Sequence, residues 1–353
     1  MLMVIFGAGA SYDSDPERPA GEAPRTGVPG VAHRPPLAAD LVAHRYGSIA
    51  NEYPASVAVI DYVRQRLGGG PEDTLETLLA QYAERAENST AARQSLIAFR
   101  FYLCQLITDM SRQWVEEANG HTVYLTLLNN LLEWQEETAQ RVQLVTFNYD
   151  TLLEDAAKRV LPDWDFDDMG AYVQRVDWGL LKLHGSINWS RVLEHPPSQG
   201  SAMNTSRAIS AAAQFADTSL PLTMRNATTV QMDAGPQVYL PGIAVPMANK
   251  TAFECESVQV EAFRSTIPEI EHLLICGWRG AEAHAVEILS EIRPGYRLGI
   301  VTGGRSDLAE IQGNLGDVYR KGKLELTQTG GMSAFARDMR SDLGAVLKSV
   351  REP

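Results

Sequence analysis

The sequence predicts an α/β fold, a Rossmann-like parallel sheet with a large helical insertion between the first and second strands. Three observations predict this fold. Residues 2–6 are a short apolar run that passes directly into glycines, as buried parallel strands do. From residue 37 to about residue 137, apolar side chains recur at helical spacing. After that, short apolar runs alternate with helical patterns, which is typical of a parallel sheet.

The remaining elements follow from the same periodicities. Strands are expected at 142–147, 179–183, 237–245, 272–276, 297–302 and 323–327. Helices are expected at 151–160, 256–267, 281–292, 306–314 and 333–349. Two segments lack a regular pattern: residues 12–36, with six prolines and three glycines, and residues 190–235, rich in small polar side chains. Long irregular loops in a compact domain are usually functional or disordered.

These patterns predict two domains. Residues 1–36 and 140–353 form the Rossmann-like domain, with 190–235 as an irregular insertion, and residues 37–139 form a helical subdomain. The helical stripes of the subdomain, including Tyr124 and its apolar neighbours, are interpreted as bundle core.

Composition limits the class of partner. The net charge is −13 and no long basic run occurs, so neither nucleic acid nor an anionic membrane is expected as a direct partner. No uninterrupted apolar stretch is long enough to span a bilayer, and residues 1–6 read as a strand rather than a signal. The three cysteines include no C-x-x-C pair. We therefore expect a cytoplasmic protein without a four-cysteine zinc site.

A glycine turn follows the first strand. Gly7, Ala8, Gly9, Ala10 and Ser11 would let backbone N–H groups approach a pyrophosphate closely. A tight turn without any ligand would have the same sequence. The third glycine of the dehydrogenase fingerprint is missing at Tyr12, which disfavours a hydride-transfer enzyme.

The strand at 142–147 ends on Asn148 and Asp150, an amide and a carboxylate. Such residues before a helix are commonly N-caps. Here Thr151 and Glu154 already have the spacing of a capping box, which would leave Asn148 and Asp150 free to face a ligand. In an open α/β sheet, ligands bind at the carboxyl ends of the strands.

Three further strand ends carry candidate groups. His184 follows the strand at 179–183, where a histidine is either a structural residue or a general base. Gly277 and Thr302 lie where two further predicted strands end. Each of these strand ends could line the adenosine half of a dinucleotide or only turn the chain. No histidine has metal-ligand spacing with a cysteine or another histidine, so no metal is expected.

In order along the chain, G-A-G-A-S, T-F-N-Y-D, L-H-G-S and the glycine exit at 277 resemble the sirtuin superfamily. Arg34-Pro35-Pro36 after the proline-rich loop looks like the entry to the helical region of bacterial sirtuin-like proteins. Protein-deacylating sirtuins carry a zinc module with two C-x-x-C pairs, and the corresponding insertion at 190–235 has no cysteine. What remains resembles the zinc-less bacterial effectors of anti-phage defence, which hydrolyse NAD⁺.

The resemblance implies a mechanism for NAD⁺, which is a substrate here. The turn Gly7–Ser11 would hold the pyrophosphate, with Arg34, Gly277 and Thr302 as further cofactor-binding residues. Asp150 would bind the nicotinamide carboxamide, and Asn148 would position the ribose and the attacking water. His184 would be the general base for cleavage of the nicotinamide–ribose bond. The products would be nicotinamide and ADP-ribose.

Other functions remain open at this point. The chain could bind NAD⁺ or ADP-ribose as a regulatory subunit without hydrolysis, or could be a zinc-less deacylase, or could be a purely structural subunit. Because a free NAD⁺ hydrolase would deplete its own cell, the resemblance also implies restraint. We expect homo-oligomerisation or a separately encoded regulator, with a HerA-type ATPase as the named candidate.

Overall fold

The computed structural model describes residues 1–20, 33–70, 72–194, 205–215, 219–225, 237–248 and 252–347. The chain forms two compact units. Unit 1 combines Met1–Pro35, Ser111–Leu183 and Ser257–Pro353, and unit 2 combines Pro36–Met110 and His184–Glu256. Residues 111–139 thus group with unit 1 and residues 184–256 with unit 2, while the domain limits given from the sequence stay a prediction.

Unit 1 is built on a six-stranded parallel sheet in the order β3-β2-β1-β7-β8-β9. The strands are β1 (Leu2–Phe6), β2 (Val142–Thr146), β3 (Trp178–Lys182), β7 (His272–Cys276), β8 (Arg297–Val301) and β9 (Lys323–Gln328). This order confirms the predicted fold class, with the helical segment between the first two strands. The chain adds β2 and β3 on one side of β1, and β7, β8 and β9 on the other side. The carboxyl ends of β1 and β7 therefore flank the topological switch point.

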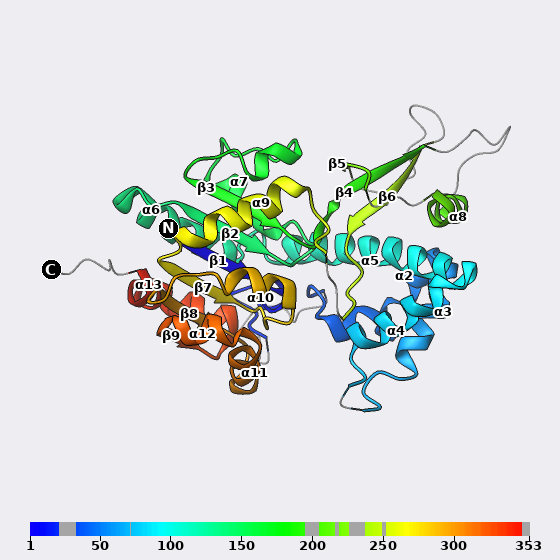
Figure 1. Ribbon diagram of the computed structural model, residues 1–353, viewed down its shortest axis with the longest axis horizontal. Helices are drawn as coiled ribbons and strands as arrows, with labels where there is room; N and C mark the ends of the chain where they lie inside the picture. The colour runs from blue at the N-terminus through cyan, green and yellow to red at the C-terminus, as the bar shows by residue number, and fades with distance from the viewer. Residues whose placement is uncertain are drawn as a thin grey trace. The chain divides into compact units, whose positions relative to one another are not determined.

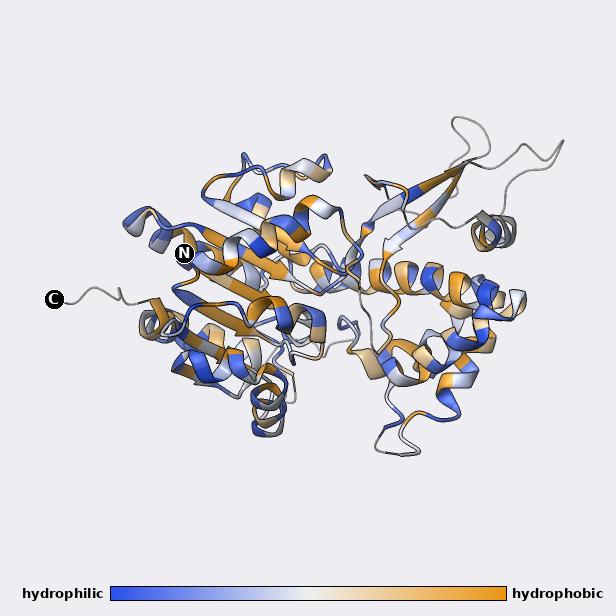
Figure 2. Cartoon of the chain, viewed as in Figure 1, coloured by the Kyte–Doolittle hydropathy of each residue, from blue (hydrophilic) through white to orange (hydrophobic). Residues whose placement is uncertain are grey.

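Burial explains why these short segments are strands. Every residue of β1, β2, β3 and β7 is buried. Strands covered on both faces read as continuous apolar runs, and these strands are coloured as hydrophobic over most of their length in Figure 2. Removing this apolar surface from water is the main term that stabilises the sheet.

Helices cover both faces of the sheet. The helices of unit 1 are α1 (Ala8–Tyr12), α6 (Val123–Thr138), α7 (Leu152–Val160), α9 (Ser257–Thr266), α10 (Ala283–Leu289), α11 (Arg305–Leu315), α12 (Asp317–Lys321) and α13 (Gly331–Leu347), with 3₁₀ turns η4 (Met169–Tyr172) and η5 (Ile267–Glu269). Helix α6 packs on α7 and α13, and α13 lies against β7, β8 and β9. Helices α9 and α10 lie in front of the sheet in Figure 1.

Unit 2 contains helices and a second sheet. Its helices are α2 (Gly47–Glu52), α3 (Val57–Arg64), α4 (Leu75–Glu87), most of α5 (Thr90–Glu117) and α8 (Thr205–Phe215), with 3₁₀ turns η1 (Ala38–Val42), η2 (His44–Tyr46) and η3 (Pro54–Ser56). Its antiparallel sheet has the order β5-β4-β6, from β4 (Gly185–Glu194), β5 (Leu222–Met224) and β6 (Gln237–Ile243).

This second sheet corrects two expectations. The strand expected at 237–245 exists as β6 but pairs antiparallel with β4, outside the parallel sheet. The segment 190–235, expected to be irregular, contains the end of β4, α8 and β5. The alternation that marks β4 (Ile187, Trp189 and Leu193 are all buried) is interrupted by Arg191, which is itself buried and forms an ion pair with Glu254.

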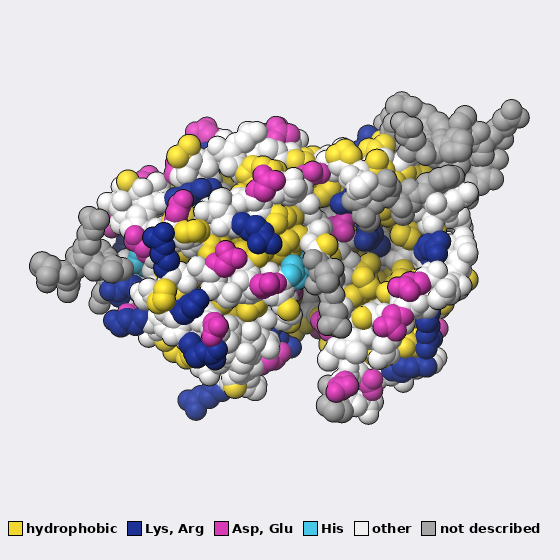
Figure 3. All heavy atoms as spheres, viewed as in Figure 1, with side chains coloured by type: hydrophobic (Ala, Val, Ile, Leu, Met, Phe, Trp, Pro, Cys, Tyr) yellow, Lys and Arg dark blue, Asp and Glu magenta, His cyan; other side chains and the backbone are white. Residues whose placement is uncertain are grey.

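The surface of unit 1 carries charges of both signs. On the face shown in Figure 3, Lys and Arg side chains are interspersed with Asp and Glu rather than gathered in one patch. Among the described residues, no helix combines the length and the apolar character that a membrane span requires.

Candidate functional site at the carboxyl edge of the parallel sheet

The glycine turn after β1 packs directly against the exit of β7. The Gly7 N–H donates to the Cys276 carbonyl at 3.0 Å, and the Gly9 N–H donates to the Gly277 carbonyl at 3.1 Å. A Cβ at Gly277 would lie 2.3 Å from the Ala10 nitrogen, and this glycine has a φ of +61°. Glycine is therefore required at this position both by its backbone conformation and by the close approach of the two chain segments.

This packing narrows how the turn could bind a phosphate. The Gly9 and Ala10 N–H groups are already used, the second by the Gly7 carbonyl at 2.9 Å, whereas Ala8 at the tip is exposed. Helix α1 has only five residues, so its dipole adds little. What the turn offers to a ligand is therefore a close backbone surface around Ala8.

Asn148 lies at the end of β2 and joins it to the turn. Its Nδ2 donates to the Gly7 carbonyl at 2.9 Å and to the Ser11 hydroxyl at 3.0 Å, and lies 3.4 Å from the Tyr124 hydroxyl. The side chain is only 7% exposed, and its Oδ1 is buried with no hydrogen-bond partner among the described residues. A buried acceptor left unpaired costs about 1–3 kcal/mol, which a donor on a ligand would recover.

Tyr124 is a residue of this cluster that the sequence pattern did not reveal. It belongs to α6, where its helical spacing indicated a core residue, and its hydroxyl lies 2.9 Å from the Ser11 hydroxyl. Burial raises the pKa of Tyr124 well above its usual range, so the phenol stays protonated. The Gly7 carbonyl, which can only accept, fixes the Nδ2 end of the Asn148 amide, and the Ser11 and Tyr124 hydroxyls complete the contacts of that end.

Asp150 is an N-cap-like residue, contrary to the capping-box hypothesis. Its Oδ1 accepts a hydrogen bond from the Leu152 N–H at 3.1 Å, at the first residue of α7. Thr151 makes no side-chain cap, and Glu154 turns inward instead of back to the helix end. The hypothesis was wrong because Glu154 pairs with a buried cation, and Asp150 takes the first N–H group of the helix.

That cation is Lys182, the last residue of β3. Its Nζ donates to Glu154 Oε1 at 2.8 Å and also to the Asp150 carbonyl, and the Tyr172 hydroxyl donates to the same Oε1 at 3.2 Å. Burial raises the pKa of Glu154, and the neighbouring Lys182 opposes that rise. Sequence reasoning missed this pair, which joins strand β3 to helix α7.

The other two residues of unit 1 predicted to bind the cofactor have structural contacts. The Arg34 guanidinium donates to the Tyr12 carbonyl at 2.5 Å and the Arg18 carbonyl at 2.7 Å, and it stacks over the Trp114 ring. Burial lowers the pKa of Arg34. Thr302 is buried at the end of β8, where its N–H donates to the Gln328 carbonyl at 2.8 Å.

His184 follows β3 in the chain and belongs to unit 2. It is buried, and its carbonyl accepts a hydrogen bond from the Ala244 N–H at 2.9 Å. The structure therefore brings together the glycine turn, Asn148 and Gly277 within unit 1. Asp150 lies two residues after Asn148. The role of His184 remains a prediction.

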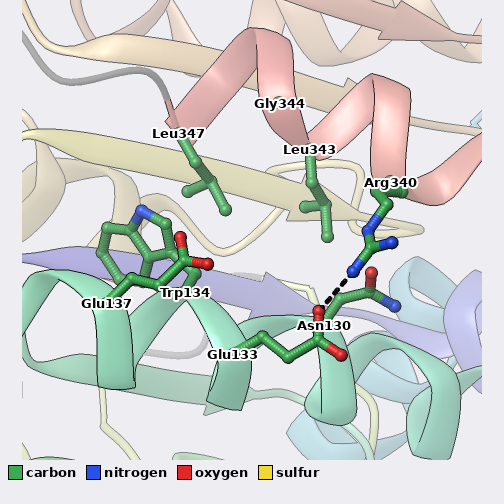
Figure 4. Close-up of a pocket in the computed structure, with 8 residues that line it drawn as sticks. All are labelled: Asn130, Glu133, Trp134, Glu137, Arg340, Leu343, Gly344 and Leu347. Atoms are coloured by element: carbon green, nitrogen blue, oxygen red, sulfur yellow. Dashed lines mark hydrogen bonds and ion pairs between the residues drawn. The ribbon is translucent and has the colours of Figure 1, made fainter.

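A surface cavity of about 280 Å³ lies between α6 and α13, at the other edge of the sheet (Figure 4). Its wall includes Trp134, whose ring lies 5.8 Å from that of His272, the first residue of β7. None of the predicted site residues lines it. Within the described ranges, no group of three or more potential metal ligands occurs.

No protein-family model matches the chain, and no curated protein sequence matches it. The solved structures similar to it include Sir2 homologues. A mutant with 2′-O-acetyl ADP-ribose is 12% identical with a TM-score of 0.41, over 99% of this chain and 94% of that one. A mutant with ADP-ribose is 13% identical with a TM-score of 0.37, over 100% and 94%. An NAD complex is 12% identical with a TM-score of 0.38, over 97% and 90%. At these scores the likenesses carry no conclusion about chemistry, and the fold class rests on the strand order itself.

Proposed function

We propose that the carboxyl edge of the parallel sheet binds NAD⁺ and that the protein hydrolyses its nicotinamide–ribose bond. The observation that carries the proposal is Asn148, a buried amide whose Oδ1 lacks a partner among the described residues. It is fixed against the glycine turn, beside the switch point where α/β sheets bind nucleotides. Ribose hydroxyls and a bound water are donors that would satisfy this oxygen.

The residues divide the chemistry in this proposal. The turn around Ala8 approaches the pyrophosphate, and Gly277 and Thr302 line the adenosine side, with Arg34 securing the loop after the turn. Asn148 orients the ribose and the water. As nicotinamide leaves, the ribose carbon develops oxocarbenium character, and the water attacks it. His184 accepts the proton of that water or of a ribose hydroxyl, a role supported by motif order alone.

Asp150 has a modified role in the proposal. Because one of its oxygens caps α7, only the remaining acceptor capacity is left for the nicotinamide carboxamide. The carboxylate is thus both a helix cap and a ligand contact, and its substitution would affect the helix start as well as binding.

The biological role proposed with this activity is depletion of NAD⁺ in anti-phage defence, in the cytoplasm. It rests on the ordered motifs and on the absence of cysteine from the 190–235 segment. Such an activity needs restraint, so the proposal includes a homo-oligomer or a separately encoded regulator, for which a HerA-type ATPase is the candidate.

Release of nicotinamide from NAD⁺ by the purified protein, alone and with the product of the adjacent gene, tests the proposal. His184→Ala and Asn148→Ala should each lower the rate by about 10²–10⁴-fold, as expected when an acid–base or positioning group is lost. The exposed residues His44 and Asn129 provide matched controls, and their alanine variants should retain the wild-type rate.

The outcomes separate the alternatives. Unchanged turnover in both site variants would refute the assignment of the site. Binding of ADP-ribose in a calorimeter without nicotinamide release would instead indicate a regulatory subunit, and removal of an acyl group from a lysine peptide would indicate a deacylase.

A further inference from the structure

The ion pair between Lys182 and Glu154 crosses the interior of unit 1. The Lys182 side chain is 0% exposed and that of Glu154 is 4% exposed, with 2.8 Å between Nζ and Oε1. The backbone N–H of Lys182 donates to Gln259 Oε1 at 2.8 Å. Both partners are thus fixed, one at the end of β3 and the other in the first turn of α7.

Stability alone does not explain this pair. Desolvating two charges costs more than their attraction commonly returns, and apolar residues of similar volume would stabilise such a position equally well or better. An ammonium group, however, has three donors, and the hydrogen bond to Glu154 Oε1 uses one of them. A second one reaches the backbone carbonyl of Asp150.

This carbonyl is the last backbone acceptor of the segment Asn148–Asp150. At its start, the Asn148 N–H donates to Thr146 Oγ1 at 3.0 Å. At its end, Lys182 holds the Asp150 carbonyl, and the Asp150 side chain holds the Leu152 N–H. The segment that presents the unpartnered Asn148 oxygen is therefore tied down on both sides.

We infer that Lys182, held by Glu154, is a positioning residue that fixes the Asn148–Asp150 segment for the reaction at the carboxyl edge. The inference rests on the proposed function, which names Asn148 as the residue that orients the ribose and water. Lys182 acts through the backbone of this segment and touches no reacting atom. Its loss would misplace Asn148 by a small distance, which is enough to slow a reaction that depends on orientation.

The double variant Lys182→Met/Glu154→Leu separates positioning from stability. Removing both charges leaves no uncompensated ion, so the melting temperature should stay near the wild-type value. Nicotinamide release should nevertheless fall by roughly 10–100-fold in kcat, as expected when an orienting group is displaced by up to about 1 Å, with KM changed much less. Lys182→Met alone should lower the melting temperature strongly, because it strands a buried carboxylate.

Arg297→Met/Glu325→Leu is the control, at an ion pair whose side chains are 18% and 20% exposed. It removes an ion pair of 3.2 Å between neighbouring strands of the same sheet, which lies at the start of β8 and away from the Asn148–Asp150 segment. Its kcat should equal that of the wild type. Should the Met/Leu pair fail to fold, Lys182→Met/Glu154→Gln keeps an amide for the Tyr172 hydroxyl and serves the same comparison.

Amide hydrogen exchange over residues 147–152, measured without nucleotide, makes the test independent of NAD⁺ turnover. Exchange should accelerate in the double variant and not in the control. Unaltered exchange, or native kcat despite faster exchange, would overturn the inference. A wild-type protein that neither binds nor cleaves NAD⁺ would defeat the proposed function, while exchange would still report whether Lys182 orders the segment.

Discussion

The two edges of the six-stranded sheet differ in how closely the chain segments beside them pack. At the amino edge, the Leu2 N–H donates to the Arg141 carbonyl at 3.0 Å and the Arg297 N–H to the Glu271 carbonyl at 2.9 Å. His272 there lies 2.8 Å from the Val346 carbonyl. The surface cavity opens near this edge, and the buried Trp134 Nε1 and Arg141 Nε have no hydrogen-bond partner among the described residues. At the carboxyl edge, two glycine segments meet in close contact, and the Asn148 Oδ1 likewise has no partner among the described residues.

The surface cavity and the candidate site lie at opposite edges of the sheet. The cavity of Figure 4 lies near the amino edge, lined by Trp134, Leu343 and Leu347 together with charged side chains. The carboxyl edge is closely packed but retains an acceptor that folding has desolvated and not repaid with a hydrogen bond. Unpaired buried atoms occur near the amino edge as well, among them Trp134 Nε1 in the cavity wall, so Asn148 is distinguished by its place beside the switch point.

The largest effect should come from breaking the close contact at the carboxyl edge. Gly277→Ala places a Cβ 2.3 Å from the Ala10 nitrogen at a φ of +61°, so the turn must move or unfold. Gly295→Ala, before β8 at the amino edge, has a φ of +94° and nothing within 4 Å. Conformational strain alone costs about 1–2 kcal/mol, so Gly277→Ala should exceed Gly295→Ala by at least ~2 kcal/mol in denaturant unfolding. Equal losses would mean that the two edges tolerate change alike.

A smaller effect is expected from Tyr124→Phe, which removes only the hydroxyl beside Ser11 and Asn148. Losing this buried hydrogen bond should cost about 1 kcal/mol of stability. Because the Asn148 amide loses one of the groups that orient it, nicotinamide release should fall by roughly tenfold. Tyr319→Phe, whose hydroxyl accepts from Gln312 at 3.0 Å on α12, should leave the rate unchanged. A normal rate in Tyr124→Phe would show that the amide needs no such support.

The smallest effect concerns the amino edge and its pH dependence. Burial lowers the pKa of His272 from its usual 6.5, so the folded state disfavours the proton that the unfolded state accepts. The free energy of unfolding should therefore decrease as the pH falls below about 6.5, by at most ~1.4 kcal/mol per pH unit, until the folded pKa is reached. In His272→Asn this contribution should disappear, with NAD⁺ turnover at neutral pH preserved. An identical pH profile for both proteins would contradict the assignment.

The parallel sheet was predictable because its information is local. Buried strands are continuous apolar runs, and the strand expected at 272–276 has the same limits in the structure. The second sheet was not predictable in this way, because Arg191 interrupts the apolar alternation of β4. Its partner Glu254 lies far along the chain.

The candidate site divides in the same way. The glycine turn and Asn148 follow apolar strands directly, so their residue types alone indicate a ligand-binding edge. Tyr124 and Lys182 gave no such signal, since a tyrosine in a helical stripe and a lysine at the end of a strand have common structural explanations. The role of Glu154 was misread because capping rules consider only neighbours in sequence, whereas its partner Lys182 lies on strand β3.

The position of β1 in the sheet has a consequence for biosynthesis. This strand, Leu-Met-Val-Ile-Phe, lies in the sheet interior between β2 and β7, and its Leu2 pairs with His272. At ordinary translation rates, the ribosome needs about 14–54 s to add the roughly 270 residues between them. During that time a wholly apolar strand waits with one edge unpaired, which is the condition under which nascent chains aggregate or bind chaperones. Yield in the cell should therefore depend on how well this strand is shielded during synthesis as much as on the stability of the finished sheet.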